Sequence, residues 1–337
     1  MHPTVSVILP VYNGSKYLRQ SIDSILCQSL QNFELIILND GSTDDSKKII
    51  DEYRDSRIIK VEHANMGLAK TLNVGLEQAR GKYIARQDQD DISFPKRLEM
   101  QVSYLENKSS LILCGGSAKI IGGGKHKQWN YPQEPGVIHC ELLFSNVFAH
   151  SSVVFRKESL DRASLRYSND YPYAEDYEMW VRCSNGHNIA NLNDLLLEYR
   201  ISPSSSSRKN VSIQESSIKR IQESILKRMC ISPTNEEWLI HRRIEYPGNI
   251  NSLAELKSFE QWLLKLKKSN DVNGIFQEET FNHVLAERWW YVCRYATSMG
   301  LNTWYCFYRS ALLMTSSPSI SKRMKLLLHT LLTNTHK

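Results

Sequence analysis

No stretch of this 337-residue chain stays apolar for the roughly 20 residues that a membrane-spanning helix needs. The N-terminus has no basic cluster, and the apolar run 5–11 is interrupted by Ser6 and Pro10, so we expect no secretory leader. The seven cysteines are scattered and never spaced as CxxC, which argues against a disulfide framework and against a thiolate zinc site. These absences favour a globular protein in a reducing, cytoplasmic compartment.

Carboxylates are missing from one part of the chain. Residues 301–337 contain no Asp or Glu, and residues 206–337 carry 19 Lys and Arg against 11 acidic residues. Residues 1–205 are nearly balanced, with 23 basic and 25 acidic residues. A basic C-terminal surface of this kind is typical of contact with an anionic partner, either a membrane or a nucleic acid.

Two hydrophobic periods alternate over the first 115 residues. Short apolar runs rich in Val and Ile predict buried strands, and between them apolar residues recur at spacings of three and four, which predicts helices. The expected strands are 5–11, 33–38, 57–61, 83–85 and 111–114. This alternation predicts an α/β fold with a mostly parallel sheet flanked by helices, in which ligands bind outside the carboxyl ends of the strands.

The pattern changes twice further along the chain. Residues 116–207 are less regular, and residues from 208 onward have helical periodicity throughout. The features expected in the middle part are a turn at 122–124, strands at 153–155 and 195–199, and a helix at 175–185. The later helices are expected at 213–229, 236–244, 253–268, 280–299, 303–314 and 320–332. We therefore expect an α/β domain over 1–207, with halves 1–115 and 116–207, and a helical region over 208–337.

Polar residues follow the second expected strand. The segment is Asn39-Asp-Gly-Ser-Thr-Asp44, and its Asp40 lies at the strand end. A carboxylate there can accept a hydrogen bond from a nucleobase or from a sugar hydroxyl. The same residues also suit a plain turn followed by a helix start at Thr43 and Asp44, and the residues alone leave both interpretations open.

An acidic cluster follows the fourth expected strand, where Asp88, Asp90 and Asp91 lie within four residues. Carboxylates this close repel one another unless a cation lies between them, and hard oxygen ligands suit Mg²⁺ or Mn²⁺. Such an ion could bridge to a diphosphate and neutralise the charge that a nucleoside diphosphate gains as it leaves. A solvated acidic loop before the helix that follows Pro95 would account for the same residues.

Several ordered motifs carry a family resemblance. They are Val5-Ser-Val-Ile-Leu-Pro-Val-Tyr-Asn13, Asn39-Asp-Gly-Ser-Thr-Asp44, Asn65 with Gly67, Asn73, Gly81-Lys-Tyr-Ile84 and Asp88-Gln-Asp-Asp91. Together they resemble the family 2 inverting glycosyltransferases of the GT-A fold, closely over residues 4–105 and in pieces as far as 205. The resemblance implies that the chain is a transferase using a nucleotide-sugar donor.

The resemblance assigns donor-binding roles to six positions. It places the nucleotide base near Pro10, Tyr12 and Asp40. It makes Asp88-Gln89-Asp90 the DxD motif, with Asp90 the stronger ligand for Mn²⁺ or Mg²⁺ and Asp88 the second candidate.

Two later segments extend the resemblance. Tyr173-Ala-Glu-Asp-Tyr-Glu-Met-Trp180 resembles the family's ED motif, in which Asp176 would be the general base beside Glu175. An inverting transfer is a one-step in-line attack, so one base beside the acceptor hydroxyl is enough. Burial and the neighbouring Glu175 would raise the pKa of Asp176, while a helix N-terminus would lower it.

Two more side chains have both a functional and a plain interpretation. The segment 149–156 resembles the part of the family that lines the donor and acceptor pocket, which makes His150 a donor-side candidate. A histidine after an apolar run can equally be a satisfied core residue. Trp180 is either an acceptor-side stacking platform or a core residue.

The sequence departs from the family in two places. Many relatives carry a histidine shortly after a Tyr-Arg pair like Tyr199-Arg200, and here Ser204–Ser207 or Arg208 would have to bind the diphosphate. The QxxRW motif of processive synthases is absent, which predicts one sugar per acceptor.

The helical region suggests a membrane-surface contact. The segment 320–332 combines basic residues with leucines, and 287–291 and 303–308 are rich in aromatic residues, as in helices that lie on anionic lipid. The same helices could simply pack together. We expect no nucleic-acid partner, because no known nucleic-acid-binding module accompanies the charge.

The combined expectation is an inverting, non-processive hexosyltransferase. By resemblance, its donor would be UDP-glucose or UDP-galactose, and its acceptor a hydroxyl of a polyprenyl-pyrophosphate-linked sugar in O-antigen or capsule synthesis. It would act as a peripheral protein at the inner face of the plasma membrane. The alternatives are a nucleotidyltransferase, which should show a Gly-rich basic loop after the first strand, and a non-catalytic sugar-nucleotide-binding protein.

Overall fold

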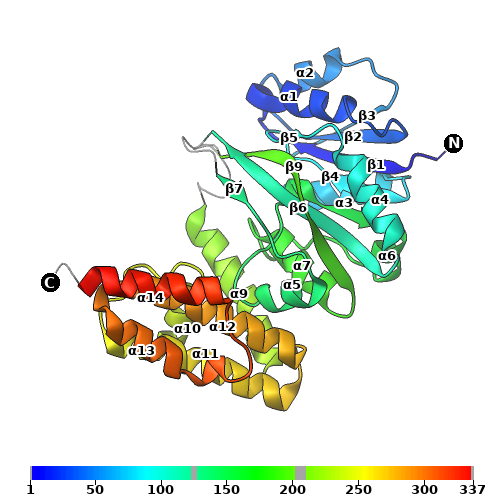
Figure 1. The fold of residues 1–337 in the computed structure, drawn as a ribbon. Coiled ribbons are helices and arrows are strands. Elements are labelled where there is room, and N and C mark those ends of the chain that lie inside the picture. The colour runs from blue at the N-terminus through cyan, green and yellow to red at the C-terminus, as the bar shows by residue number, and fades with distance from the viewer. Residues whose placement is uncertain (1, 123–126, 202–209, 335–337) are drawn as a thin grey trace. The chain divides into compact units, whose positions relative to one another are not determined.

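The computed structural model describes residues 2–122, 127–201 and 210–334, and these form two compact units (Figure 1). The first unit comprises residues 1–138 and 147–219, and the second comprises 139–146 and 220–337. The expected turn at 122–124 lies partly outside the described residues, and the candidate diphosphate ligands Ser204–Ser207 and Arg208 lie wholly outside them.

A mixed nine-stranded sheet forms the centre of the first unit. Its order is β3-β2-β1-β4-β8-β6-β9-β5, with β7 paired to β6. The strands are β1 (Val5–Val11), β2 (Phe33–Asp40), β3 (Ile58–His63), β4 (Tyr83–Arg86), β5 (Ile92–Ser93), β6 (Leu111–Ile121), β7 (Gln128–Trp129), β8 (Val154–Arg156) and β9 (Asn188–Arg200). The expected α/β fold class is confirmed.

Parallel pairing is concentrated in the N-terminal half of the sheet. Strand β1 pairs in parallel with both β2 and β4, and β2 pairs in parallel with β3. The helices α1 (Ser15–Leu26), α2 (Ser46–Glu52) and α3 (Leu68–Gln78) connect these strands, and a helical crossover is what parallel neighbours require. Strand β8 then pairs antiparallel with β4 and with β6, so the sheet reverses direction there.

Both faces of the central strands are covered. Val5, Val7 and Leu9 pack in the same cluster as the apolar residues of α1 and α2. Ile8 and Leu38 face the opposite side, where they lie against Gly75 of α3. All seven residues of β1 are buried, including the polar Ser6, so the strand does not alternate between buried and exposed residues.

Among the described residues, the first unit also contains α4 (Arg97–Asn107), most of α5 (Pro135–Glu141), α6 (Lys157–Arg162), α7 (Glu175–Ser184) and the 3₁₀ turn η1 (His150–Ser152). The sequence predicts α7 within one residue but gives no signal for α5 or α6, which are only seven and six residues long. The expected strand 195–199 was too short, because β9 begins at Asn188. Register shifts opposite β6 and the exposed run 193–195 disrupt its alternation.

Helices make up most of the second unit. Helix α9 (Val211–Arg228) leads into α10 (Asn235–Arg243), α11 (Leu253–Asn273), α12 (Glu278–Arg294), α13 (Leu301–Arg309) and α14 (Ile320–Asn334). The expected helix 280–299 was too long, because α12 ends at Arg294 and a separate 3₁₀ turn, η2, covers Thr297–Met299. The expected helix 303–314 likewise ends early, at Arg309, and is followed by η3 (Ala311–Leu313).

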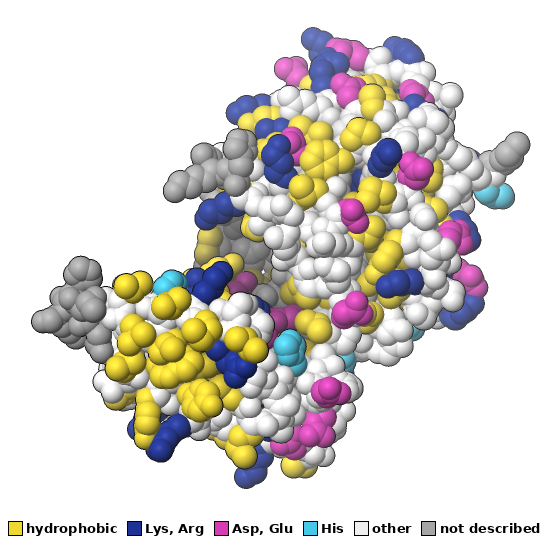
Figure 2. Space-filling view, viewed as in Figure 1, with side chains coloured by type: hydrophobic (Ala, Val, Ile, Leu, Met, Phe, Trp, Pro, Cys, Tyr) yellow, Lys and Arg dark blue, Asp and Glu magenta, His cyan; other side chains and the backbone are white. Residues whose placement is uncertain are grey.

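The core of the second unit includes a buried aromatic cluster around His241. The His241 ring stacks on Phe144 and Trp238, and Trp262 donates its indole N–H to His241 Nδ1 at 3.1 Å. Burial lowers the pKa of His241 to about 3, so the ring is a neutral core residue. On the outside of the same unit, apolar side chains gather over α13 and α14 (Figure 2). None of the described helices is long and apolar enough to cross a membrane.

Candidate active site

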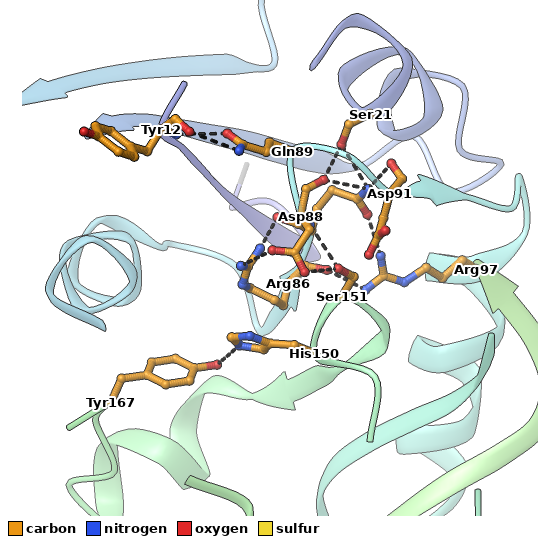
Figure 3. A network of polar contacts seen from close by, with 11 residues as sticks. Tyr12, Ser21, Arg86, Asp88, Gln89, Asp91, Arg97, His150, Ser151 and Tyr167 are labelled. Atoms are coloured by element: carbon orange, nitrogen blue, oxygen red, sulfur yellow. Dashed lines mark hydrogen bonds and ion pairs between the residues drawn. The ribbon is translucent and has the colours of Figure 1, made fainter. Parts of the chain in front are cut away.

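The end of β1 is joined to the acidic segment by one glutamine. Gln89 Oε1 accepts the backbone N–H of Tyr12 at 2.9 Å, and Gln89 Nε2 donates to the Tyr12 carbonyl at 3.1 Å (Figure 3). A Cβ on Gly14 would come within 2.2 Å of Gln89 Oε1, so glycine leaves room for this amide. Pro10 is buried, whereas the Tyr12 side chain is exposed. The structure therefore brings Pro10, Tyr12 and Gln89 to the same strand end.

Asp40 is buried at the end of β2 and holds the start of α3. Its Oδ1 accepts the Met66 N–H at 2.7 Å, its Oδ2 accepts the Gly67 N–H at 3.1 Å, and His63 Nδ1 lies 3.3 Å from Oδ1. The carboxylate thus organises the β3–α3 loop from within. A hydrogen bond to a nucleobase remains a prediction, and it would have to share oxygens that already have partners.

Asp44 satisfies the helix starts near this loop. It accepts backbone N–H groups from Ser15, the first residue of α1, and from Ser46, the first residue of α2. Burial opposes ionisation, but these hydrogen bonds prevail and lower the pKa of Asp44 to about 2. The cap interpretation considered for this motif therefore belongs to Asp44.

Asp88 is engaged by protein groups on both of its oxygens. Arg86 Nη2 lies 2.5 Å from Asp88 Oδ1, and Ser151 donates its hydroxyl to Asp88 Oδ2 (Figure 3). Burial favours the neutral acid, but the Arg86 charge and these hydrogen bonds outweigh it and hold the pKa of Asp88 below its ordinary value. Asp88 is therefore an ionised carboxylate beneath the acidic loop.

The other two carboxylates of the cluster have raised pKa values. Burial and the nearby Asp88 raise the pKa of Asp90 to about 6. Asp91 is 1% exposed, and burial together with Asp88 and Asp90 raises its pKa well above the ordinary value. Asp91 Oδ1 accepts the Arg200 N–H at 2.8 Å, while Oδ2 is buried without a hydrogen-bond partner. With all three carboxyls ionised, the loop would hold more negative charge than its protein partners neutralise, and the raised pKa values reflect this repulsion.

This charge surplus fits a divalent cation. Asp90 is the carboxylate best suited to bind one, since Asp88 is held by Arg86 and Ser151. The described residues contain no group of three or more His, Cys, Asp or Glu side chains arranged to hold a metal ion. A bound ion would therefore need further oxygen ligands from water or from a diphosphate.

His150 and Trp180 pack against each other. His150 Nε2 lies 3.1 Å from the Tyr167 hydroxyl, and burial, followed by the Arg86 charge, lowers the pKa of His150 to about 3. Trp180 is 0% exposed and contacts Phe148, Phe155 and the edge of His150. The packing favours the core interpretation of Trp180. Because its indole presents no exposed face on which an acceptor could stack, we give Trp180 no acceptor-side role.

The predicted ED motif begins α7. Tyr173 adopts a left-handed φ of 62° just before the helix, and Ala174 precedes Glu175 as the N-cap. Glu175 is 7% exposed, and burial, followed by the Asp176 charge, raises its pKa to about 7. Asp176 is half-buried, and its Oδ1 accepts the Tyr177 N–H at 2.7 Å.

Electrostatics connects this motif to the acidic loop. The charges of Arg86 and Asp88 both act on Glu175, and those of Arg86 and Asp176 act on Tyr167. The ends of β4, η1 and α7 therefore meet around the buried Arg86. The structure brings together the predicted residues Asp88, Asp90, His150, Glu175 and Asp176, while Asp40 and Tyr12 lie at the adjoining strand ends.

Arg86 and Arg200 were missed as site residues. Arg86 is 2% exposed, although it ends a strand of otherwise apolar residues. Arg200 Nε donates to the Asp90 carbonyl at 2.9 Å, and its guanidinium lies 4.0 Å from the centre of the Tyr17 ring. Arg86 could have been found from the sequence, because it is a charged residue at the end of an otherwise apolar, buried strand. Nothing local marks Arg200 as a partner of a loop 110 residues earlier.

Comparison with known proteins identifies the family. The model of Glycosyl transferase family 2 matches residues 6–163. The amylovoran biosynthesis glycosyltransferase AmsE of Erwinia amylovora is 35% identical over 203 residues, which cover 58% of this chain and 75% of AmsE. This chain belongs to glycosyltransferase family 2.

Other comparisons agree with this membership. A Haemophilus influenzae glycosyltransferase is 36% identical to this family 2 glycosyltransferase over 213 residues, which cover 59% of the chain and 66% of the relative, just under two thirds. The structure of S. aureus TarS 1-349 in complex with UDP-GlcNAc aligns with a TM-score of 0.57 and 17% identity. The alignment covers 99% of this chain and 92% of that one, and at this identity it shows the fold alone.

Proposed function

We propose that this family 2 glycosyltransferase transfers a hexose from a UDP-sugar to an acceptor hydroxyl in one inverting, non-processive step. The observation that carries the proposal is the gathering of the Asp88–Asp90 loop and the Glu175–Asp176 pair around Arg86. One group of carboxylates can serve the donor diphosphate, and the other the acceptor hydroxyl.

Asp176 is the proposed general base. It lies at the first turn of α7, beside the buried Glu175, whose pKa of about 7 keeps it partly protonated at neutral pH and largely protonated below it. A protonated Glu175 adds no negative charge next to Asp176, and it can donate a hydrogen bond. Asp176 would remove the acceptor proton during the in-line attack.

Asp90 is the proposed ligand of Mn²⁺ or Mg²⁺, with Asp88 held behind it by Arg86. The raised pKa of Asp90 marks a local excess of negative charge that a dication would neutralise. When bound, such an ion supplies Lewis-acid stabilisation of the leaving diphosphate. In this proposal Asp90 and Asp88 serve the donor diphosphate, and Tyr12 and Asp40 serve the nucleobase of the donor.

The donor sugar and acceptor are proposed at the level of chemical class. UDP-glucose and UDP-galactose are the first donors to test, with a polyprenyl-pyrophosphate-linked sugar as acceptor. The proposed setting is the synthesis of a surface polysaccharide such as O-antigen or capsule, at the inner face of the plasma membrane. The name of the relative AmsE, which refers to amylovoran biosynthesis, supports this setting.

A donor screen tests the proposal. Full-length protein is mixed with Mn²⁺ or Mg²⁺ and a panel of nucleotide sugars, and nucleoside diphosphate release is followed with and without a lipid-pyrophosphate sugar. Consumption of one donor that increases with acceptor is the expected result. If no nucleotide sugar is bound or consumed under any condition, the proposed activity is wrong.

Two variants test the roles of Asp176 and Asp90 separately. Asp176→Asn should retain donor binding and lose roughly 100-fold or more in transfer rate, because general-base catalysis contributes about that much. Asp90→Asn should lose metal-dependent donor binding measured by calorimetry. The exposed Asp194 supplies the control variant Asp194→Asn, which should bind and transfer like the wild type.

A further inference from the structure

Helix α14 carries an apolar stripe on its outer side. Ile320, Met324, Leu328 and Leu331 are 71%, 50%, 53% and 42% exposed, and they recur at spacings of four, four and three. That spacing places them on one side of a helix. The inward side includes Leu326 and Thr330, both 0% exposed. The helix therefore presents apolar residues to the outside as well as to its own unit.

Helix α13 adds aromatic side chains of the same kind. Leu301, Tyr305 and Tyr308 are 45%, 56% and 64% exposed at spacings of four and three, while Phe307 is buried. Helices α13 and α14 pack against each other. We call the exposed set the α13–α14 apolar face, and Figure 2 shows apolar side chains gathered there. Its members are Leu301, Tyr305, Tyr308, Ile320, Met324, Leu328, Leu331 and Leu332.

The charged residues that α13 and α14 themselves contribute to this face are all basic. Arg309 is exposed and lies over the Tyr305 ring, 4.4 Å from its centroid, and Lys325 is exposed on α14 next to Met324. Lys322 is paired with Glu287 of α12, so it contributes less free charge. Residues 301–337 contain no carboxylate, so no acidic residue within this segment offsets the basic ones.

Eight partly exposed apolar side chains on two adjacent helices form a continuous face rather than scattered single residues, and such a face marks a contact surface. Aromatic rings, leucines and cations without carboxylates are the combination that an interfacial helix uses on anionic lipid. A second copy of the chain would bring the same positive charges together at the contact, which charge repulsion opposes. The positive charge beside the face therefore favours an anionic bilayer over a second copy of the chain.

We infer that the α13–α14 apolar face is a docking surface for an anionic lipid bilayer, entered by Tyr305, Met324 and Leu328 with Arg309 and Lys325 at the headgroups. The inference deepens the proposed function, on which it rests for a reason to bind a membrane, since that function has a lipid-linked acceptor. The surface belongs to the helical unit alone, so it can be tested independently of the catalytic residues.

Vesicle flotation of the full-length protein tests the inference. The vesicles are phosphatidylcholine alone, or phosphatidylcholine with about 30% phosphatidylglycerol as the anionic component. The test variant is Tyr305→Ser/Met324→Ser/Leu328→Ser. The matched control is Leu239→Ser/Val272→Ser, which removes apolar residues that are 62% and 78% exposed elsewhere in the same unit. Circular dichroism and melting curves establish that both variants fold.

The expected result is strong binding to anionic vesicles and weak binding to neutral ones. The triple variant should bind at least roughly tenfold more weakly, because three partly inserted apolar side chains are lost. The control variant should bind like the wild type, and 0.5 M salt should weaken binding because it screens Lys and Arg from the headgroups.

Three outcomes would overturn the inference. They are absence of vesicle binding, binding that does not depend on anionic lipid, and binding that the triple substitution leaves unchanged. Light scattering that shows a wild-type dimer and a monomeric triple variant would assign the face to a second copy instead. Donor turnover without vesicles is measured in parallel. If the wild type turns over no donor, the proposed function is refuted. If it turns over donor but does not float with vesicles, only the docking surface is refuted.

Discussion

At the scale of single residues, Arg86 has the most consequential position. Its guanidinium is 2% exposed, donates to Asp88, and leaves Nε buried without a hydrogen-bond partner. A buried charge that keeps one donor unsatisfied is costly, so its opposing charge must supply most of the compensation. The free energy of unfolding therefore depends on the ionised Asp88 of the acidic loop, which compensates the charge of Arg86.

Replacing Arg86 by methionine should strongly destabilise the protein. Asp88 would then be a carboxylate without its opposite charge, so we expect a loss of roughly 3–5 kcal/mol in the free energy of unfolding, measured with urea. The control is Arg162→Met, which removes an arginine of 76% side-chain exposure from its pair with Glu158 and should change stability by less than about 0.5 kcal/mol. Equal effects of the two substitutions would contradict the role given to Arg86.

Glu175 predicts a pH dependence of stability. Its pKa is about 7 in the folded protein against an ordinary value of 4.5, so the folded state binds the proton more tightly. The contribution of Glu175 to the free energy of unfolding is therefore fully present below about pH 4.5, the ordinary pKa, and is lost as the pH rises towards and through 7. Glu175→Gln should flatten this decline and raise the free energy of unfolding at pH 8 by on the order of 2 kcal/mol.

Urea titrations of the metal-free protein at several pH values between 4 and 8 measure this effect. The control is Glu158→Gln on the exposed side of α6, which should leave the pH profile unchanged. A Glu175→Gln variant that keeps the wild-type slope would show that Glu175 is ionised in the folded protein.

At the scale of elements, the β2–α3 junction depends on close backbone approach. Asp40 at the end of β2 accepts N–H groups from Met66 and Gly67, and this draws the β3–α3 loop against Gly41. A Cβ at Gly41 would lie 2.6 Å from the Asn65 backbone nitrogen, whereas one at Gly67 would meet nothing within 4 Å. Both glycines have positive φ, so a side chain is strained at either position, but only Gly41 also lacks the space for a Cβ.

This difference gives a matched pair of variants. Gly67→Ala should cost roughly 1–3 kcal/mol, because φ 87° with ψ 158° is a conformation that essentially only glycine adopts. Gly41→Ala should cost more, and it should also weaken UDP-sugar binding because the loop held by Asp40 must move. Thermal unfolding and donor titration compare the two variants. Equal losses in both measurements would contradict the packing argument.

At the scale of the whole molecule, the helical unit includes a short segment from the middle of the chain. Residues 139–146 belong to this unit, where Leu142, Leu143 and Phe144 are at most 1% exposed. The Phe144 carbonyl accepts from Gln222 at 2.7 Å, and the Leu143 carbonyl contacts His241 Nε2 at 3.1 Å. Glu141 forms an ion pair with Arg288 of α12. The core of the helical unit therefore depends on residues that precede it by about 80 positions or more.

A chain shortened to residues 1–219 should consequently be prone to aggregate. It would retain Leu142, Leu143 and Phe144 without the helices that bury them, and such an exposed apolar patch promotes association. Light scattering of the shortened protein measures this. Adding Leu142→Ser and Phe144→Ser to it should reduce aggregation. A shortened chain that is monomeric without these changes would contradict the dependence.

Local patterns in the sequence were enough to predict some of the elements. The bounds of β1 and the start of α7 were predicted correctly, because a short, mostly apolar run and a regular helical period depend only on neighbouring residues. The family motifs also marked the strand ends where the site lies. The long β9 was not predicted, because its pairing with β6 contains register shifts that no local pattern encodes.

Three-dimensional packing, and not the sequence pattern, establishes what each side chain faces. It paired Asp88 with Arg86 and Ser151, placed Trp180 in the core, and brought Arg200 to Asp90 across 110 residues. It also decided which leucines of α14 point outward. Periodicity shows that apolar residues share one side of a helix, but only packing shows whether another part of the protein covers that side. For Met324 and Leu328 none of the described residues does so fully, since half of each side chain remains exposed.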